Sequence, residues 1–132
     1  MRIGRGVVPE IRENLYHWRV VVEGPSGSPY EGTRYVVEVD FPEQFPFKFP
    51  SFRFKTPIHH PNIKEGLICQ EMLGEKEWLP NKKVVEVIET ILSMLHSPDV
   101  SSAINLEAAA QVKNGTFFAV AKEKAQKEAL PL

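Results

Sequence analysis

Proline is the residue that most restricts what the first half of this chain can form. The chain has eleven prolines in 132 residues, and eight of them fall between Pro9 and Pro61. Proline breaks the interior of a helix, and within sheets it is confined to edges, strand starts and bulges. We therefore expect strands and turns, and no helices, in the first half of the chain.

Three segments between these prolines have the character of strands. Residues 16–23 are rich in valine and aromatic side chains, and residues 35–41 largely alternate between apolar and polar. Residues 51–55 alternate strictly, which puts Phe52 and Phe54 on one face. Because the connections are short and rich in turn residues, the pattern predicts an antiparallel meander.

The pattern of apolar and polar residues changes in the second half of the chain. Residues 56–83 have little periodicity and many turn residues, so we expect an irregular stretch, which in a compact domain tends to be functional. Apolar residues then recur at helical spacing over 82–96, and Ser97-Pro98 should end that helix.

Two shorter helices are expected after it. Asn105 is a suitable N-cap for a helix that runs to Lys113 and closes at Asn114-Gly115. Thr116 is expected to cap a last helix through about Ala129. Strands first and helices later predict one α+β domain over residues 1–132, with an antiparallel meander sheet packed against a central helix and with C-terminal helices.

Composition excludes several classes of partner. The net charge is −1, which gives no positive field for nucleic acid, and no apolar run is long enough to span a bilayer. The first five residues are no secretory signal. The single cysteine cannot form an internal disulfide and suits a reducing compartment. We expect a cytoplasmic or nuclear monomer with no nucleic-acid or membrane partner.

That cysteine is the strongest chemical candidate. Cys69 follows the turn His60-Pro61-Asn62 by seven residues, inside the irregular stretch. A loop cysteine near polar groups can be an accessible nucleophile. Acyl transfer through its sulfur would pass through an oxyanion, to which the Asn62 carboxamide can donate, and Pro61 would fix the backbone beside it.

The residues alone leave other interpretations open. A lone cysteine is more often a buried hydrophobe, and an asparagine after proline is more often a turn residue. A cysteine peptidase would need the ring of His59 or His60 to reach Cys69. A metal site formed by these three residues is too small and poorly spaced for zinc, so we expect no metal and no cofactor.

Several linked motifs resemble one family. His60-Pro61-Asn62, Gly66-Leu67-Ile68-Cys69 and Trp78-Leu79-Pro80 resemble, in order and spacing, the signature of ubiquitin-conjugating enzymes. The resemblance covers residues 14–129 and extends to further short motifs: Leu15-Tyr16-His17-Trp18, Gly24-Pro25, Tyr30-Glu31-Gly32, Phe41-Pro42, Phe45-Pro46-Phe47-Lys48-Phe49-Pro50, Ser97-Pro98 and Ile104-Asn105-Leu106-Glu107-Ala108-Ala109.

The resemblance implies a role for each matching residue. Cys69 would accept ubiquitin or a ubiquitin-like modifier as a thioester from an activating enzyme and pass it to a substrate lysine. Asn62 would stabilise the oxyanion or order the loop that shapes the site. The family often has an acidic residue or a serine in the loop after the long helix that helps to deprotonate or position the incoming lysine. Here the aligned candidate is Ser102, with Asp99 close by: Asp99 could accept the proton, and Ser102 could only orient the amine. Three residues would be structural at the site: His60, Pro61 and Trp78.

The resemblance also implies a ligase surface. A ligase, of the RING type or similar, would bind Phe47 and Lys48 in the proline-rich loop, and Leu79, Pro80 and Asn81 after the tryptophan. By pattern alone, Phe47 is equally suited to covering the edge of the core.

Three departures from the family pattern leave the modifier's identity open. Residues 1–14 can supply only a fragment of the usual first helix, so we expect either a truncated form or charging through another surface. The interval from Asn62 to Cys69 is one residue short and that from Cys69 to Trp78 one residue long, and Gln70-Glu71 is an unusual pair. The alternative function is a non-catalytic scaffold of the same fold that binds modifiers or ligases; the missing first helix argues for it, and the retained Cys69 and Asn62 argue against it.

Overall fold

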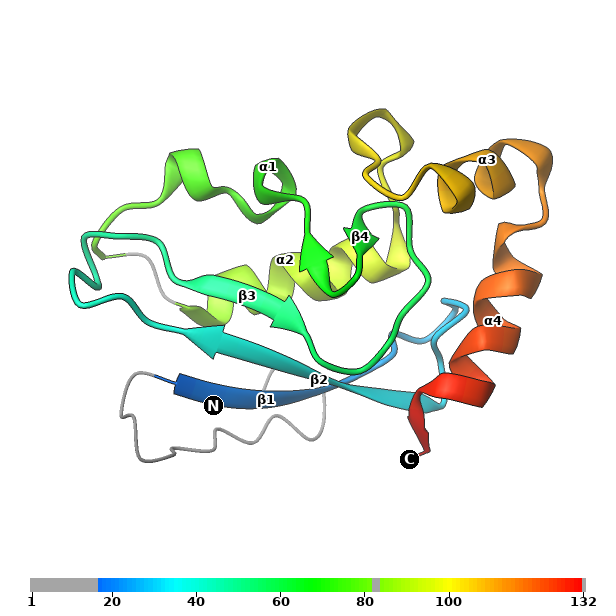
Figure 1. Ribbon diagram of the computed structural model, residues 1–132, viewed down its shortest axis with the longest axis horizontal. Coiled ribbons are helices and arrows are strands. Elements are labelled where there is room, and N and C mark those ends of the chain that lie inside the picture. Colours follow the sequence, from blue (N-terminus) through cyan, green and yellow to red (C-terminus); the bar gives the residue numbers. More distant parts are fainter. Residues whose placement is uncertain (1–16, 82–83, 132) are drawn as a thin grey trace.

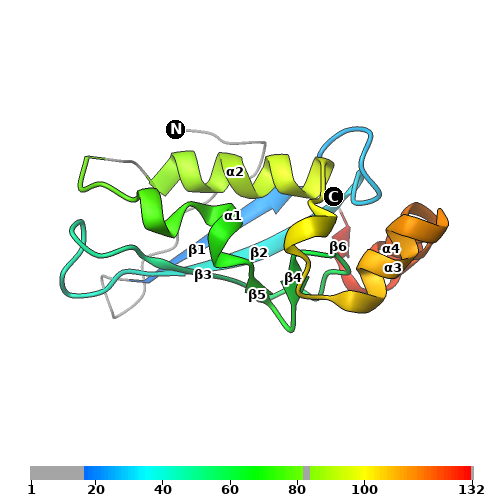
Figure 2. The same ribbon diagram turned by 90° about the horizontal axis from the view of Figure 1, so that it is seen from above.

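The described part of the chain forms one sheet with helices on one face and at one end (Figure 1, Figure 2). The computed structural model describes residues 17–81 and 84–131. The sheet has the order β1-β2-β3-β5-β4, with β6 paired to β2, and every pairing is antiparallel. Its strands are β1 (His17–Glu23), β2 (Thr33–Asp40), β3 (Ser51–Phe54), β4 (Ile63–Lys64), β5 (Leu67–Ile68) and β6 (Leu130–Pro131).

Alternation along the strands decides which face becomes the core. Phe52 and Phe54 are both buried, at 3% and 2% exposure, while Ser51 and Arg53 between them are exposed. The prediction that the two phenylalanines share a face is therefore confirmed. On β2 the exposed or half-buried Glu38 and Asp40 alternate with buried valines in the same way, so one face of the sheet is apolar and the other polar.

The helices lie against the apolar face and beyond one end of the sheet (Figure 2). Those of α type are α1 (Gln70–Leu73), α2 (Val84–His96), α3 (Leu106–Asn114) and α4 (Phe117–Glu128), and short 3-10 turns occupy Glu75–Glu77 and Val100–Ser102. The buried side chains of α2 recur at helical spacing: Val84, Val87, Ile88, Ile91, Met94 and Leu95. The predicted α+β class and the central helix are confirmed.

The predicted ends of the last two helices are nearly right. Asn105 accepts a hydrogen bond from the Ala108 N–H at 3.1 Å and caps α3, which ends at Gly115 with a φ of 83°. Thr116 does precede α4, but its side chain makes no capping bond. Its hydroxyl donates to Asn114 Oδ1 instead, so the predicted cap is wrong in mechanism although right in position.

The expectation of an irregular stretch over 56–83 is wrong in part. It contains β4, β5, α1 and a 3-10 turn. The two strands are joined by Glu65 and Gly66, both at positive φ, which is the geometry of a tight two-residue hairpin. Strand β6, which pairs with Thr33 and Arg34, was not predicted either. The expectations for residues 1–14 and for positions 82–83 of the central helix lie outside the described residues.

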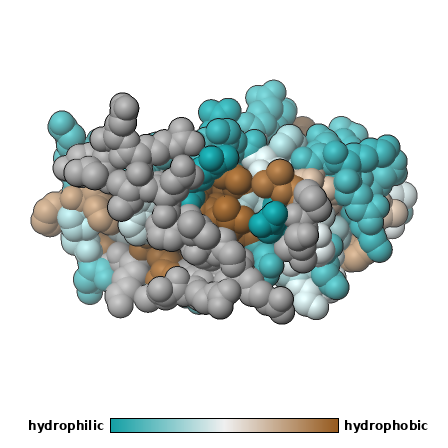
Figure 3. Space-filling model, turned by 90° about the horizontal axis from the view of Figure 1, so that it is seen from below, coloured by the Kyte–Doolittle hydropathy of each residue, from teal (hydrophilic) through white to brown (hydrophobic). Residues whose placement is uncertain are grey.

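The surface of the described residues carries both hydrophilic and hydrophobic side chains. Seen from below, hydrophobic atoms gather near the middle of this face and at its left-hand end, with hydrophilic atoms around them (Figure 3). None of the described helices is long and apolar enough to cross a bilayer.

Candidate active site

Cys69 lies directly after the hairpin of β4 and β5. Its backbone N–H donates to the carbonyl of Asn62 at 2.9 Å, which extends the pairing of the two strands by one position. The thiol is free and half-buried. The hairpin therefore holds the cysteine at a fixed position beside Asn62 while leaving part of it open to solvent.

Gly66 fixes the hairpin against β3. Its φ is 84°, and a Cβ placed on it would lie 2.5 Å from the carbonyl oxygen of Phe54. The Phe54 N–H in turn donates to the Gly66 carbonyl at 2.9 Å. Only glycine allows this backbone conformation and this close approach together, so Gly66 sets the position of the strand that leads to Cys69.

His60 is a buried, neutral histidine in this turn. Its ring is fully buried, and its Nε2 lies 2.7 Å from the carbonyl of Met94 in α2, so Nε2 carries the proton. Its Nδ1 accepts a hydrogen bond from the Asn62 N–H at 2.9 Å. Burial lowers the pKa of His60 to about 4. With both nitrogens occupied, the ring links the turn to α2.

The Asn62 side chain is fully buried and points to the loop after α2. Its Nδ2 donates to the carbonyls of Asp99 at 2.8 Å and Ser102 at 3.1 Å, and its Oδ1 accepts from the Asp99 N–H at 3.0 Å. Both amide hydrogens are therefore used within the protein. In this arrangement Asn62 orders the loop, and it has no hydrogen left to give to an oxyanion.

Pro61 and His59 join the same turn to the C-terminal helices. The Pro61 carbonyl accepts from the N–H groups of Ile104 at 2.8 Å and Asn105 at 2.9 Å. The His59 ring lies 2.6 Å from Gln111 Oε1 and stacks on Phe117. Both nitrogens of His60 and the Nε2 of His59 are thus bonded to groups other than Cys69. No cluster of three or more His, Cys, Asp or Glu side chains suited to a metal occurs among the described residues.

Asp99 and Ser102 both lie in the loop that Asn62 orders. The Asp99 carboxylate accepts hydrogen bonds from the Ser101 hydroxyl at 2.6 Å and the Ser101 N–H at 3.0 Å. These bonds lower the pKa of Asp99, and the bond from the Ser101 hydroxyl has the largest effect. The carboxylate therefore stays ionised at neutral pH, which suits it to attract an ammonium group better than to accept its proton.

The two segments of the expected ligase surface lie side by side. Trp78 donates its Nε1–H to the Pro46 carbonyl at 2.8 Å, and its ring contacts Phe49 with the centroids 5.4 Å apart. Phe47 is 77% exposed and Leu79 is 60% exposed. Lys48, Pro80 and Asn81 are exposed as well. Trp78 is thus the half-buried link that keeps these exposed side chains together.

Sequence reasoning missed the partners that hold the turn. They are the Tyr30 hydroxyl, which donates to the His59 carbonyl, the Met94 carbonyl and the Gln111 side chain. Tyr30 lies in one of the short motifs that resemble the family, so the sequence pointed to it. No sequence pattern marks a backbone carbonyl or a helical glutamine as a partner of the turn.

Known proteins share this architecture. The family model described as ubiquitin-conjugating enzyme matches residues 3–127. A probable ubiquitin-conjugating enzyme E2 31 of Arabidopsis thaliana is 43% identical over 79% of this chain and 68% of its own. A ubiquitin conjugating enzyme E2 B of Dictyostelium discoideum is 38% identical over 90% of this chain and 82% of its own.

Solved structures agree with the sequence relatives. A putative ubiquitin conjugating enzyme from Plasmodium yoelii superposes with a TM-score of 0.89 at 27% identity, covering 97% of this chain and 86% of that one. The E2 domain of a Toxoplasma gondii ubiquitin conjugating enzyme gives 0.86 at 30% identity, over 95% and 89%. With a family match over nearly its whole length, the chain belongs to the ubiquitin-conjugating enzyme family, whose members are transferases.

Proposed function

We propose that the chain accepts ubiquitin or a ubiquitin-like modifier as a thioester on Cys69 from an activating enzyme and transfers it to a substrate lysine with the help of a ligase. The observation that carries the proposal is the position of Cys69. It is a free, half-buried thiol at the end of a hairpin, next to the ordered turn His60-Pro61-Asn62.

The rigidity of the site supports an acyl-carrying role. A sulfur that must meet two large partners in turn, an activating enzyme and an acceptor, needs a fixed position and an open approach. The hydrogen bonds of His60 and Asn62 tie the turn to α2 and to the loop 99–102, and Cys69 keeps part of its surface exposed.

The loop 99–102 would receive the incoming lysine. The ionised Asp99 carboxylate lies in this loop and attracts an ammonium group. The Ser102 side chain is half-buried, and its hydroxyl can orient the amine but cannot accept its proton. The proposal therefore gives Asn62 a positioning role, through the loop, in place of direct contact with the oxyanion.

A charging assay tests the proposal. The chain is incubated with activating enzyme, ATP and a panel of modifiers, and the products are separated without reducing agent. We expect a band heavier by one modifier that disappears with thiol. Cys69→Ser should give an ester that survives thiol, and Cys69→Ala should give neither. Absence of any adduct across the panel would favour the non-catalytic scaffold.

The hydrogen bonds also bear on the peptidase alternative. A cysteine peptidase needs a histidine that exchanges a proton with the thiol. The Nδ1 of His60 is occupied within the turn and its Nε2 by the Met94 carbonyl of α2, and the Nε2 of His59 is held by Gln111. Retention of thioester formation in His59→Gln would argue further against this alternative.

A further inference from the structure

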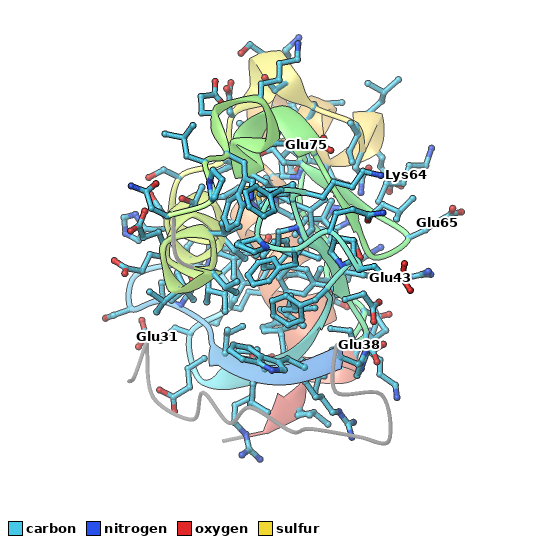
Figure 4. The ribbon with its side chains drawn as sticks, turned by 90° about the vertical axis from the view of Figure 1, so that its left-hand side faces the viewer. Glu31, Glu38, Glu43, Lys64, Glu65 and Glu75 are labelled. Carbon is cyan, nitrogen blue, oxygen red and sulfur yellow. The ribbon has the colours of Figure 1, made fainter. Side chains whose placement is uncertain are left out.

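The polar face of the sheet has a hollow beside the hairpin that leads to Cys69. The hollow has a volume of about 580 Å³ and lies over β2 and β3, against the segment 56–58 and the tip of the hairpin. Its charged lining residues are two cations and three carboxylates: Arg53, Lys55, Glu38, Asp40 and Glu65. Figure 4 shows Glu38 and Glu65 on the same side of the molecule. The proposed function gives this hollow no role.

The register of the sheet puts this hollow on the face to which Cys69 belongs. Arg53 pairs with Leu67 of β5 on one side and with Glu38 of β2 on the other. Paired residues share a face, so Leu67, which is 56% exposed, lies on the same face as Arg53. Side chains two positions apart on a strand also share a face, and the hydrogen bond from the Cys69 N–H to the Asn62 carbonyl continues the strand to that position. Cys69 therefore follows Leu67 on the face of the hollow.

The two cations lie within reach of a peptide bound at Cys69. Arg53 is opposite Leu67, two residues before Cys69, and Lys55 is two residues further in the direction away from Cys69. A strand rises about 3.4 Å per residue, so the two cations are displaced from Cys69 by about 7 Å and about 14 Å along the strand. An extended peptide rises by the same amount. A peptide with its lysine at Cys69 therefore brings residues about two to four positions from that lysine to the cations.

Neither Arg53 nor Lys55 is neutralised within the described part of the molecule. Both side chains are exposed, and neither forms a hydrogen bond or an ion pair with a described residue. Glu38 is directly opposite Arg53, but its carboxylate lies 3.1 Å from His17 Nε2, and the Asp40 carboxylate lies 2.6 Å from Nδ1 of the same ring. The carboxylates of β2 are thus engaged from β1, which leaves the two cations available to an anion from outside.

Charges of opposite sign lie toward the two ends of the hairpin. At the Cys69 end, Asn62 holds the loop after α2, whose Asp99 carboxylate stays ionised. Toward the tip, Lys64 of β4 adds a third exposed cation to the two of the hollow, and Glu65 offsets one of the three (Figure 4). An acceptor segment that complements this arrangement carries its lysine at one end and acidic residues a few positions away.

We propose that the hollow docks acidic residues of the acceptor protein that lie about two to four positions from the acceptor lysine. This inference rests on the proposed function and narrows its substrate class. The Arg53 guanidinium can hold a carboxylate through two parallel hydrogen bonds, and the Lys55 ammonium attracts a second carboxylate as a point charge. Docking makes and breaks no covalent bond. It raises the concentration of the acceptor lysine at the thioester, where Asp99 attracts the ammonium group.

Two acceptor peptides, each with a single lysine, test this site. The residues at the positions just given, on both sides of the lysine, are glutamates in one peptide and glutamines in the other. The chain is charged, ATP is removed, and the loss of the thioester is followed over a range of peptide concentrations. We expect a half-saturating concentration about threefold to tenfold lower for the glutamate peptide, which is the effect of a few exposed ion pairs, and similar rates at saturation.

Charge reversal in the hollow is the decisive variant. Arg53→Glu combined with Lys55→Glu should abolish the preference for the glutamate peptide or invert it. Lys113→Glu combined with Lys122→Glu, which reverses two exposed lysines of α3 and α4, should keep the preference and serves as the matched control. Because each result is a ratio of two peptides on the same charged variant, any change in charging cancels. The preference of the wild type should also shrink at high salt, because salt screens exposed charges.

The outcomes separate this inference from the proposed function. If no thiol-sensitive adduct forms with any modifier, the proposed function fails and the docking site fails with it. If the thioester forms but the two peptides have equal half-saturating concentrations, or the preference survives the double reversal in the hollow, only the docking site is overturned. A preference confined to the rate at saturation would overturn it as well, because the glutamates would then act at the reacting atoms. If the double reversal cannot be charged, the wild type decides, and a preference that salt does not reduce overturns the site.

Discussion

Mild acid should destabilise this fold through His60, because its ring is buried in the neutral form. The pKa of His60 falls from 6.5 to about 4, chiefly through desolvation. In the unfolded chain His60 therefore binds a proton near pH 6.5, whereas in the folded chain it does so only near pH 4. The contribution of His60 to stability is complete above the unfolded pKa and is lost as the pH falls through this window.

The size of the effect follows from the two pKa values. Inside the window, each pH unit costs up to about 1.4 kcal/mol, because one more proton is bound by the unfolded state. Between about pH 7.5 and about pH 5 this amounts to about 2 kcal/mol. A loss of that size is a large part of the stability of an ordinary domain.

Urea unfolding, followed through the fluorescence of Trp18 and Trp78, measures the effect at each pH. His60→Gln keeps an N–H donor but cannot be protonated, so its stability should fall by about 2 kcal/mol less than that of the wild type. His96→Gln replaces an exposed histidine and serves as the control for the substitution itself. Parallel pH profiles of the wild type and His60→Gln would refute the reasoning. If the variant does not fold, an NMR titration of the wild type replaces it, and a His60 ring that titrates near its ordinary value would refute the reasoning equally.

Three further substitutions test other parts of the site. Asn62→Ala should lower the free energy of unfolding in urea by about 1–3 kcal/mol, because the part-buried Asp99 N–H loses its partner. It should also slow discharge to lysine more than charging, and equal loss in both steps would count against ordering of the loop. Gly66→Ala should lower the melting temperature more than Gly32→Ala does. Both glycines have positive φ, but only at Gly66 would the added Cβ lie 2.5 Å from a backbone oxygen. Equal losses in the two variants would contradict this. Phe47→Ala, at a side chain 77% exposed, should change stability by less than about 0.5 kcal/mol and weaken only ligase-stimulated discharge.

The periodic parts of the fold were predictable from the sequence. The alternation around Phe52 and Phe54 fixed the buried face of β3, and the helical spacing of apolar residues identified α2. Asn105 and Gly115 marked the ends of α3. These signals are local, because a strand or helix shows its buried face in its own residues.

The tight hairpin before Cys69 was not predictable, because its signal is weak. Its strands have two residues each, too few to show alternation, and Glu65 takes a φ of 52° that glutamate seldom adopts. The partners of Asn62 were hidden for a different reason. Asp99 lies 37 positions away along the chain, and only the packing of α2 against the sheet brings its loop to the turn. Sequence pattern could suggest that Asn62 matters but could not tell which groups its amide would meet.

The same hydrogen bonds explain how the site could hold a reactive acyl group without losing it to water. Hydrolysis of a thioester is accelerated by a base that takes a proton from the attacking water. His60 has a pKa of about 4 and both nitrogens occupied, the His59 ring is held by Gln111, and the pKa of Asp99 is lowered by Ser101. Of these groups in the turn and loop around Cys69, His60 and Asp99 are poorly suited to activate water, and the Nε2 of His59 is held by Gln111. An amine needs no such help once it is neutral, since it is a far better nucleophile than water. On the proposed function, a turn that buries its histidines and a loop that keeps its carboxylate ionised would therefore favour transfer of the acyl group to an amine over hydrolysis of the thioester.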